Sequence, residues 1–290
     1  MNASAPRSLV STEWLAARLD DPDLRVVHVS PDRKAYDGGH VPGAVFSSLH
    51  ADLAKVGLRP ETGSARREYL VPTREETAEA LGRWGVAPGW RVVFYDDAGM
   101  GRHAIRGYWL LRLYRFPVDR VHVLDGGLSV WLAEGREVTT VEPAVAPGGT
   151  EPLGDRDDGL VATAEDVLAW SREASVPGGP PRILDVRTVD EFLGYDVRAA
   201  HGGHVPGARL RPFTDFVAPD GRLRPAADVL AILRGSGVDP VELRATYCQG
   251  GIRAALAWFA LSEVAGLTGV RSFAGSWEEW GNRPDLPVAR

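Results

Sequence analysis

Two kinds of hydrophobic pattern alternate along this chain. Short apolar runs, rich in valine and bounded by turn-forming residues, predict buried strands. Between them, apolar residues recur at the spacing of an amphipathic helix. In the first half the strands are expected at residues 24–29, 91–95 and 121–124, and the helices at residues 12–19, from residue 73 onward and at residues 105–113. This alternation predicts an α/β fold, with a parallel sheet flanked by helices.

A long repeat sets the number of domains. The heptapeptide Gly-Gly-His-Val-Pro-Gly-Ala occupies residues 38–44 and recurs letter for letter at residues 202–208. Further segments align in the same order: residues 25–29 with 182–186, 91–96 with 244–248, and the glycine turn before Trp131 with the turn before Trp280. We therefore predict two homologous α/β domains, each with its own parallel sheet flanked by helices.

The domain boundary is expected where the apolar periodicity stops. Residues 142–159 hold prolines, glycines and acidic residues, a composition typical of a linker. The first domain is therefore placed at residues 9–141 and the second at residues 160–290. The second repeats the plan of the first, with a helix capped by Thr163 and Asp166 and another at residues 225–233.

Composition excludes several classes of function. A net charge of −6, with 44% hydrophobic and 25% charged residues, is ordinary for a globular protein and gives no overall attraction to nucleic acid or to an anionic membrane. No apolar run approaches the ~20 residues of a membrane helix, and residues 1–8 lack the pattern of a signal peptide. The single cysteine excludes an intramolecular disulfide. We expect a cytoplasmic protein.

That single cysteine stands in the most informative loop. A β-type segment at residues 245–247 leads into Cys248, two glycines and Arg253, and an apolar helical run follows at residues 254–261. A helix N-terminus and a nearby arginine both favour a thiolate. A lone cysteine is usually a small buried apolar residue, but the glycines and arginine at a strand-to-helix junction favour a nucleophile.

The spacing Cys-x-x-Gly-x-Arg at residues 248–253 resembles the active-site loop of rhodanese-type sulfurtransferases, in which the cysteine carries sulfur as a persulfide. Cysteine phosphatases also end such a loop with arginine, but have five intervening residues where this chain has four. The resemblance covers nearly the whole chain and implies two rhodanese-like domains in tandem.

The resemblance also implies roles for other residues. Asp185-Val186-Arg187, followed by Glu191, is similar to a family segment whose arginine approaches the anionic head of the substrate. We therefore expect Arg187 to bind substrate, with Asp185 and Glu191 as structural support. His40 and His204 belong to the repeated turn of both domains, so we assign them to the turn and not to catalysis.

The first domain departs from the family pattern at the position of the nucleophile. Asp96 stands where the second domain has Cys248, and the loop after it is longer. A carboxylate cannot carry sulfane sulfur, so the first domain is expected to be inactive and the second catalytic.

The expected activity is transfer of a sulfane sulfur from thiosulfate to cyanide or a thiol through a persulfide on Cys248. Arg253 and the backbone amides of Gln249, Gly250, Gly251 and Ile252 are the expected substrate-binding groups. No metal or other cofactor and no nucleic-acid or membrane partner is implied, and the oligomeric state is left open. The first alternative is a 3-mercaptopyruvate sulfurtransferase. A cysteine phosphatase or arsenate reductase and a non-catalytic rhodanese-like binding module are lesser alternatives.

Overall fold

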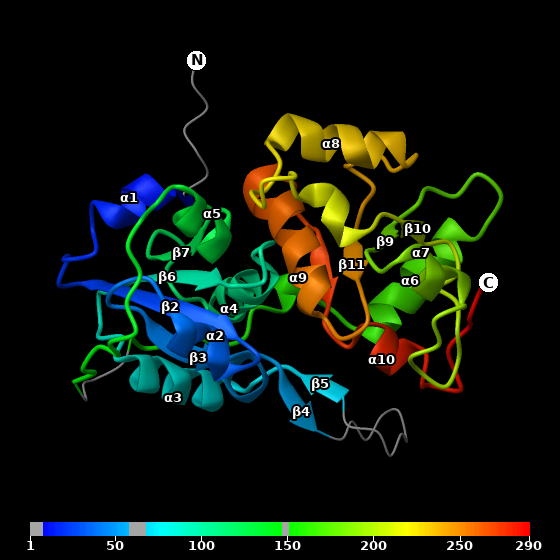
Figure 1. Cartoon of the computed structure of the whole chain (residues 1–290). Helices are drawn as coiled ribbons and strands as arrows, with labels where there is room; N and C mark the ends of the chain where they lie inside the picture. Colours follow the sequence, from blue (N-terminus) through cyan, green and yellow to red (C-terminus); the bar gives the residue numbers. More distant parts are fainter. Residues whose placement is uncertain (1–7, 58–67, 147–150) are drawn as a thin grey trace. The chain divides into compact units, whose positions relative to one another are not determined.

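The computed structural model describes residues 8–57, 68–146 and 151–290 of the chain (Figure 1). The described residues contain two five-stranded parallel sheets, each flanked by helices. The predicted α/β class, with two similar parallel-sheet domains, is therefore confirmed.

The chain divides into two compact units, and neither is continuous in sequence. Unit 1 consists of Met1–Lys55, Val71–Asp157 and Ala218–Leu223, and unit 2 of Val56–Leu70, Asp158–Val217 and Arg224–Arg290. Each half of the sequence thus contributes one short segment to the unit built mainly from the other half.

The sheet of unit 1 has the strand order β1-β7-β6-β2-β3. Its strands are β1 (Leu9–Val10), β2 (Leu24–Ser30), β3 (Val45–Ser48), β6 (Arg91–Asp96) and β7 (Val121–Leu124). Its helices are α1 (Thr12–Ala16), α2 (Arg33–Gly38), α3 (Arg74–Trp84), α4 (Arg102–Leu113) and α5 (Gly127–Ala133). Side chains alternate between the two faces of the sheet. Val93 packs in a core cluster with Leu15 of α1 and Trp131 of α5, whereas Phe94 meets Trp84 of α3 edge to face.

Unit 2 repeats this arrangement. Its sheet has the order β8-β12-β11-β9-β10, which matches unit 1 strand for strand. The strands are β8 (Val161–Ala162), β9 (Ile183–Asp185), β10 (Arg209–Leu210), β11 (Ala245–Tyr247) and β12 (Arg271–Phe273). The helices are α6 (Ala164–Ala174), α7 (Val189–Leu193), α8 (Ala226–Gly235), α9 (Ile252–Phe259) and α10 (Ser276–Trp280). Trp280 of α10 is fully buried in the core.

Shorter elements connect these parts. A two-stranded sheet pairs β4 (Lys55–Gly57) with β5 (Glu68–Leu70). The π-helical turns are η1 (Leu49–Leu53) and η5 (Ala260–Val264), and the 3₁₀ turns are η3 (Asp158–Leu160) and η4 (Phe213–Phe216).

Helix starts follow the predicted capping chemistry. Thr73 and Thr163 each form a capping box, in which the threonine hydroxyl and the third helical residue satisfy one another's backbone amides. Helix α4 begins at Arg102, earlier than the apolar pattern suggested, because Gly101 adopts a left-handed conformation and turns the chain directly into the helix.

The repeated turn holds its histidines by stacking. The ring of His40 lies 3.7 Å from the ring of Tyr36, and that of His204 lies 3.6 Å from Phe192, centroid to centroid. The Nδ1 atom of each histidine also bonds the backbone carbonyl of the residue on which it stacks. Both histidines are parts of the turn, as predicted.

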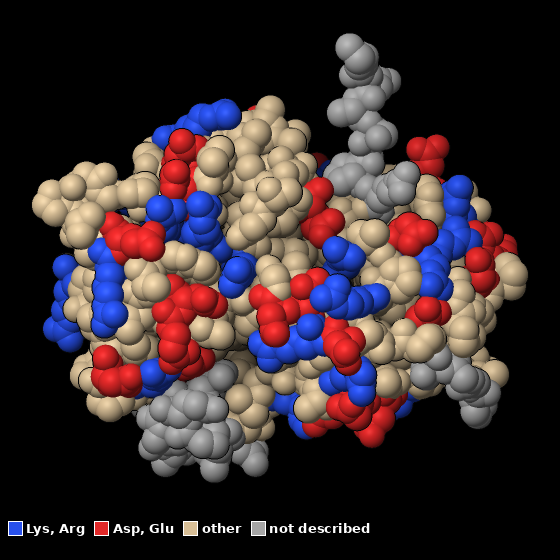
Figure 2. Space-filling view, turned by 180° about the vertical axis from the view of Figure 1, so that it is seen from behind, with Lys and Arg blue, Asp and Glu red and all other residues tan. Residues whose placement is uncertain are grey.

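Charge is distributed in small pairs over the surface. Acidic and basic side chains are interspersed on the face shown in Figure 2, and many pair locally, as Arg222 does with Glu134 at 2.8 Å. No helix within the described ranges is long and apolar enough to cross a membrane.

Candidate active site

The cysteine loop lies between β11 and α9 (Figure 1). Cys248 follows the last residue of β11 directly and is 1% exposed. The backbone N–H of Gly251 donates to Cys248 Sγ at 3.1 Å. This amide stands at the start of α9, where N–H groups have no partner inside the helix and favour negative charge.

Gly251 is required by this geometry. Its φ of +86° is in the left-handed region, which strains any residue with a side chain. A Cβ atom built on Gly251 would also lie 2.7 Å from the carbonyl oxygen of Ala274. Glycine therefore lets the loop close around the sulfur.

The first residues of α10 hold the loop from a neighbouring strand end. The N–H groups of Trp277 and Glu278 donate to the carbonyls of Cys248 and Gln249, both at 2.9 Å. The N–H of Cys248 donates in turn to Ser276 Oγ at 3.1 Å. Ser276 has a φ of +52°, an uncommon and costly conformation for a residue with a side chain. The loop's backbone is thus fixed on both sides of the sulfur.

A buried ion pair stands beside the cysteine. Arg253 donates through both terminal nitrogens to the two carboxylate oxygens of Glu191, each at 2.7 Å. Glu191 also accepts the N–H of Thr188 at the start of α7. Burial opposes the charge of Glu191, but the bonds and charge of Arg253 outweigh it and lower the pKa of this carboxyl to about 2.

The same balance acts on Arg253. Burial of its guanidinium favours the neutral form, but the hydrogen bonds that it donates to Glu191 and its electrostatic interaction with Cys248 raise the pKa of Arg253 above its ordinary value. Arg253 therefore places a permanent positive charge close to the sulfur. Both terminal nitrogens already bind Glu191, so Arg253 also fixes the loop to α7.

Arg187 follows the end of β9, and its side chain turns into the core. It is 1% exposed, and its guanidinium bonds both carboxylate oxygens of Asp185 and the carbonyl of Gly203. It also lies over the ring of Trp277, at 4.4 Å from the centroid. These contacts anchor Arg187 in the core of unit 2, and its substrate-binding role stays a prediction. Asp185 also accepts the backbone N–H of Arg187 at 3.0 Å, and its supporting role stays a prediction.

Arg198 lies at the rim of the site and was not among the residues predicted from the sequence. Its side chain is half-exposed, and Nη1 lies 3.3 Å from Glu191 Oε1. Its carbonyl accepts a hydrogen bond from Gln249 Nε2 at 3.2 Å. The only sequence signal was a basic residue shortly before the repeated turn.

Tyr69 is a second residue of the site that was not predicted from the sequence. It belongs to β5, comes from the first half of the chain, and is part of unit 2. An added Cβ on Gly250 would lie 2.2 Å from Tyr69 Cδ2, so the ring packs directly on the cysteine loop. No local pattern could indicate this contact, because the two residues are far apart in sequence.

The other residues predicted to bind substrate are those of the cysteine loop itself. Among the loop amides expected to bind substrate, that of Gly251 contacts the sulfur, while the roles of Gln249, Gly250 and Ile252 stay predictions. The Oε1 atom of Gln249 is buried and has no donor among the described residues.

Unit 1 carries a matching loop with a different residue at its start. Tyr95 in β6 and Tyr247 in β11 hold equivalent places, since each hydroxyl accepts the N–H of the valine in the repeated turn, at 3.0 and 3.1 Å. Asp96 follows Tyr95 as Cys248 follows Tyr247. Asp96 therefore occupies the structural position of the cysteine.

The carboxylate of Asp96 fills the N-terminus of its own helix. Its Oδ2 accepts the N–H groups of His103 and Ala104, at 2.8 and 3.3 Å, in the first turn of α4. Its Oδ1 is buried without a hydrogen-bond partner in the described part of the chain. The chain thus supplies an internal anion at the site where unit 2 presents a thiol.

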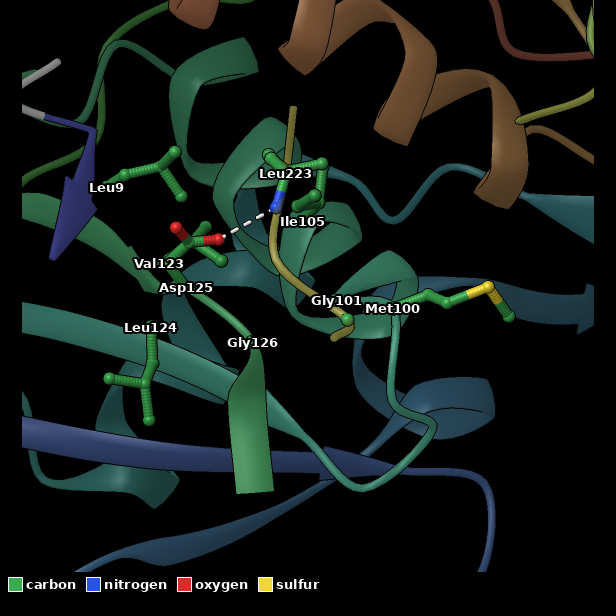
Figure 3. Close-up of a pocket in the computed structure, with 10 residues that line it drawn as sticks. Leu9, Met100, Gly101, Ile105, Val123, Leu124, Asp125, Gly126 and Leu223 are labelled. Atoms are coloured by element: carbon green, nitrogen blue, oxygen red, sulfur yellow. Dashed lines mark hydrogen bonds between the residues drawn. The ribbon is translucent and has the colours of Figure 1, made fainter. Parts of the chain in front are cut away.

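A small pocket lies beside this loop of unit 1 (Figure 3). Met100 and Gly101 line it together with Asp125, which accepts the N–H of Leu223 at 2.9 Å. Burial raises the pKa of Asp125, against the opposing effect of that hydrogen bond. None of the residues that line the pocket is a nucleophile of the kind found in unit 2. Within the described ranges, no cluster of three or more His, Cys, Asp or Glu side chains could hold a metal ion.

Comparison with known proteins gives one consistent result. The profile of the Rhodanese-like domain matches residues 11–134 and 163–283. A thiosulfate sulfurtransferase of Corynebacterium glutamicum is 35% identical, over 98% of this chain and 90% of its own length. A probable 3-mercaptopyruvate sulfurtransferase of Pseudomonas aeruginosa is 36% identical, over 97% of both chains.

A solved structure supports the same grouping. The SseA protein of Escherichia coli, described among 3-mercaptopyruvate sulfotransferases, superposes with a TM-score of 0.75 at 26% identity. The match covers 93% of this chain and 98% of that chain. The similarity therefore includes both repeats and not one domain alone.

Proposed function

The chain belongs to the rhodanese-like family of sulfurtransferases, and we propose that Cys248 carries a sulfane sulfur from thiosulfate to a thiol or to cyanide. The observation that carries this assignment is the contact of the Gly251 N–H with Cys248 Sγ, at a helix N-terminus. Arg253 adds positive charge beside the same sulfur. These groups stabilise negative charge at the position of the sulfur, which the proposed reaction requires.

The proposed reaction has two steps. The Cys248 thiolate attacks the outer sulfur of thiosulfate, a new S–S bond forms, and the donor's S–S bond breaks with its electron pair leaving on sulfite. An acceptor thiolate or cyanide then attacks the outer sulfur of the persulfide and returns Cys248 to its thiolate form. The loop amide and Arg253 stabilise the negative charge on sulfur in both states.

A mass spectrum of the protein after incubation with thiosulfate tests this function. We expect the gain of one sulfur atom on Cys248 and its removal by cyanide. A protein that gains no sulfur from thiosulfate or from 3-mercaptopyruvate would contradict the proposal.

The relatives differ in the sulfur donor that their names give: one is a thiosulfate sulfurtransferase and another a probable 3-mercaptopyruvate sulfurtransferase. We propose thiosulfate as the preferred donor, since a dianion gains more from two nearby arginines than a monocarboxylate does. Arg253 and the half-exposed Arg198 are these two charges. A 3-mercaptopyruvate sulfurtransferase is the alternative, supported by the Pseudomonas and Escherichia relatives.

We expect Arg198→Ala to raise KM for thiosulfate by about tenfold and to lower kcat less, because one charge-assisted bond contributes ~1.5–3 kcal/mol. In the wild type, kcat/KM should be higher for thiosulfate than for 3-mercaptopyruvate. Steady-state kinetics with both donors at one pH and ionic strength measure both effects. Arg209→Ala, which removes an exposed arginine from β10, is the matched control. A higher kcat/KM for 3-mercaptopyruvate would reverse the assignment of the donor.

We further propose that unit 1 has no sulfurtransferase activity of its own, because Asp96 stands in the position of the nucleophile. Its carboxylate caps α4 and has no means of forming a persulfide. In this view Asp96 stabilises the helix, and catalysis depends on unit 2.

Asp96→Ala should leave kcat within a few-fold of wild type but reduce the free energy of unfolding by about 1 kcal/mol, the usual effect of losing a helix cap. Asp96→Asn keeps an oxygen acceptor and should recover most of that stability. Denaturant unfolding and steady-state kinetics give the two readouts. A folded Asp96→Ala protein with kcat reduced a hundredfold would show that unit 1 takes part in the chemistry.

A further inference from the structure

Tyr69 covers the part of the cysteine loop that has no side chain of its own. An added Cβ on Gly250 would lie 2.2 Å from Tyr69 Cδ2 and 3.0 Å from Glu278 Oε2. Real Cβ atoms essentially never come as close as that first distance, so the ring occupies the space above Gly250. The glycine is therefore complementary to a tyrosine that the chain supplies from β5.

One glutamate ties Tyr69 and the loop together. Glu278 Oε2 accepts the backbone N–H of Tyr69 at 2.8 Å, and the N–H of Glu278 donates to the carbonyl of Gln249 at 2.9 Å. Glu278 lies in the first turn of α10. The residue before it, Trp277, donates its N–H to the carbonyl of Cys248. Tyr69 is thus fixed to the same framework that positions the sulfur.

Burial and nearby charged groups shift the pKa of the Tyr69 hydroxyl. Burial raises its pKa, the charges of Glu278 and Cys248 raise it further, and Arg198 acts in the opposite direction. The phenol therefore stays protonated at neutral pH and keeps its O–H as a hydrogen-bond donor. The ring that carries this donor packs on Gly250, within the same loop as the sulfur.

We propose that Tyr69 is a further substrate-binding residue of unit 2: its ring holds the Gly250 turn closed, and its hydroxyl donates to the anion released when sulfur is transferred. This inference rests on the proposed function of Cys248. In the first step the electron pair of the broken S–S bond leaves on sulfite, and a neutral donor near that anion stabilises the developing charge. No proton is transferred, so Tyr69 stays a phenol throughout. The second step releases no such anion from the donor.

The two half-reactions separate this role from a purely structural one. We expect Tyr69→Phe to slow persulfide formation from thiosulfate about tenfold, as for the loss of one hydrogen bond to a charged group. Transfer from the preformed persulfide to cyanide should keep its wild-type rate. Single-turnover kinetics of each half-reaction, with the persulfide confirmed by mass spectrometry, provide the measurement.

Matched variants keep the outcome clear. Tyr195→Phe alters a tyrosine of unit 2 that is 79% exposed and should change neither half-reaction. Gly250→Ala should slow persulfide formation by displacing the ring, and Tyr69→Ala in the same chain should relieve that displacement. Unchanged donor kinetics in Tyr69→Phe, or equal slowing of both half-reactions, would overturn the role of the hydroxyl. Absence of any persulfide in the wild type would instead remove the proposed function, and this inference with it.

Discussion

Cys248→Ser is expected to abolish persulfide formation while the protein stays folded. A serine hydroxyl is not appreciably ionised near neutral pH and forms no stable persulfide, so kcat should fall on the order of 10⁴-fold or more. The side chain is 1% exposed, and its sulfur accepts the Gly251 N–H, which a hydroxyl oxygen can also accept. Sulfur uptake is read by mass spectrometry and thiocyanate production by steady-state assay.

The control is a test that the Cys248→Ser variant is folded as stably as the wild type. Circular dichroism and the unfolding midpoint should match the wild type, since oxygen replaces sulfur with little change of shape. Sulfur transfer above a trace in the purified variant would show that Cys248 is not the carrier and would end the assignment of this loop as the active site.

The fold was predictable because its signals are local and repeated. Alternating valine-rich runs and capped helices gave the class, and the heptapeptide at residues 38–44 and 202–208 gave the number of domains. Helix ends were less accurate. The expected helix at residues 12–19 ends at Ala16, and the start of α4 depended on the backbone of Gly101, which the apolar pattern does not encode.

The cysteine loop was predictable for the same reason, whereas its partners were only partly so. A motif fixes the order of residues but not the direction of a long side chain. Arg187 and Arg253 both lie near strand or helix ends, and both have nearby carboxylates. Arg187 turns inward to Asp185 and packs on Trp277, while Arg253 pairs with Glu191 beside the sulfur.

The contributions of distant segments could not be read from the sequence at all. Strand β5 comes from the first half of the sequence but belongs to unit 2, where its Tyr69 packs on the loop of Cys248. Residues 218–223 join unit 1, where a Cβ on Gly221 would lie 2.7 Å from the carbonyl of Gly99, in the loop after Asp96. The loop that begins at Cys248 and the loop that begins at Asp96 are therefore each contacted by a segment from the other half of the sequence. Nothing in local periodicity specifies such an exchange.

Glu191→Gln is expected to have the largest effect on stability, and the effect should depend on pH. The pKa of Glu191 is lowered from 4.5 to about 2 by its bonds to Arg253, against the opposing effect of burial. A carboxyl whose pKa is depressed on folding stabilises the protein fully above its unfolded pKa, and this contribution is lost as pH falls through the folded pKa. The shift corresponds to roughly 3 kcal/mol at neutral pH.

The Gln variant should therefore be less stable than the wild type by roughly 3 kcal/mol at pH 7, because Arg253 keeps its buried charge without a charged partner. The difference should persist down to about pH 4.5 and shrink progressively toward about pH 2, where the wild-type carboxyl is itself protonated. Denaturant unfolding at a series of pH values measures it. Glu242→Gln, which alters a more exposed ion pair with Arg182, should change stability by no more than about 0.5 kcal/mol at any of them. Persulfide formation should also slow in Glu191→Gln, since Arg253 is no longer fixed beside Cys248. If Glu191→Gln and the wild type were equally stable across this pH range, the ion pair would not hold the loop. The backbone contacts of Gly251 and α10 would then be the contacts that position the sulfur.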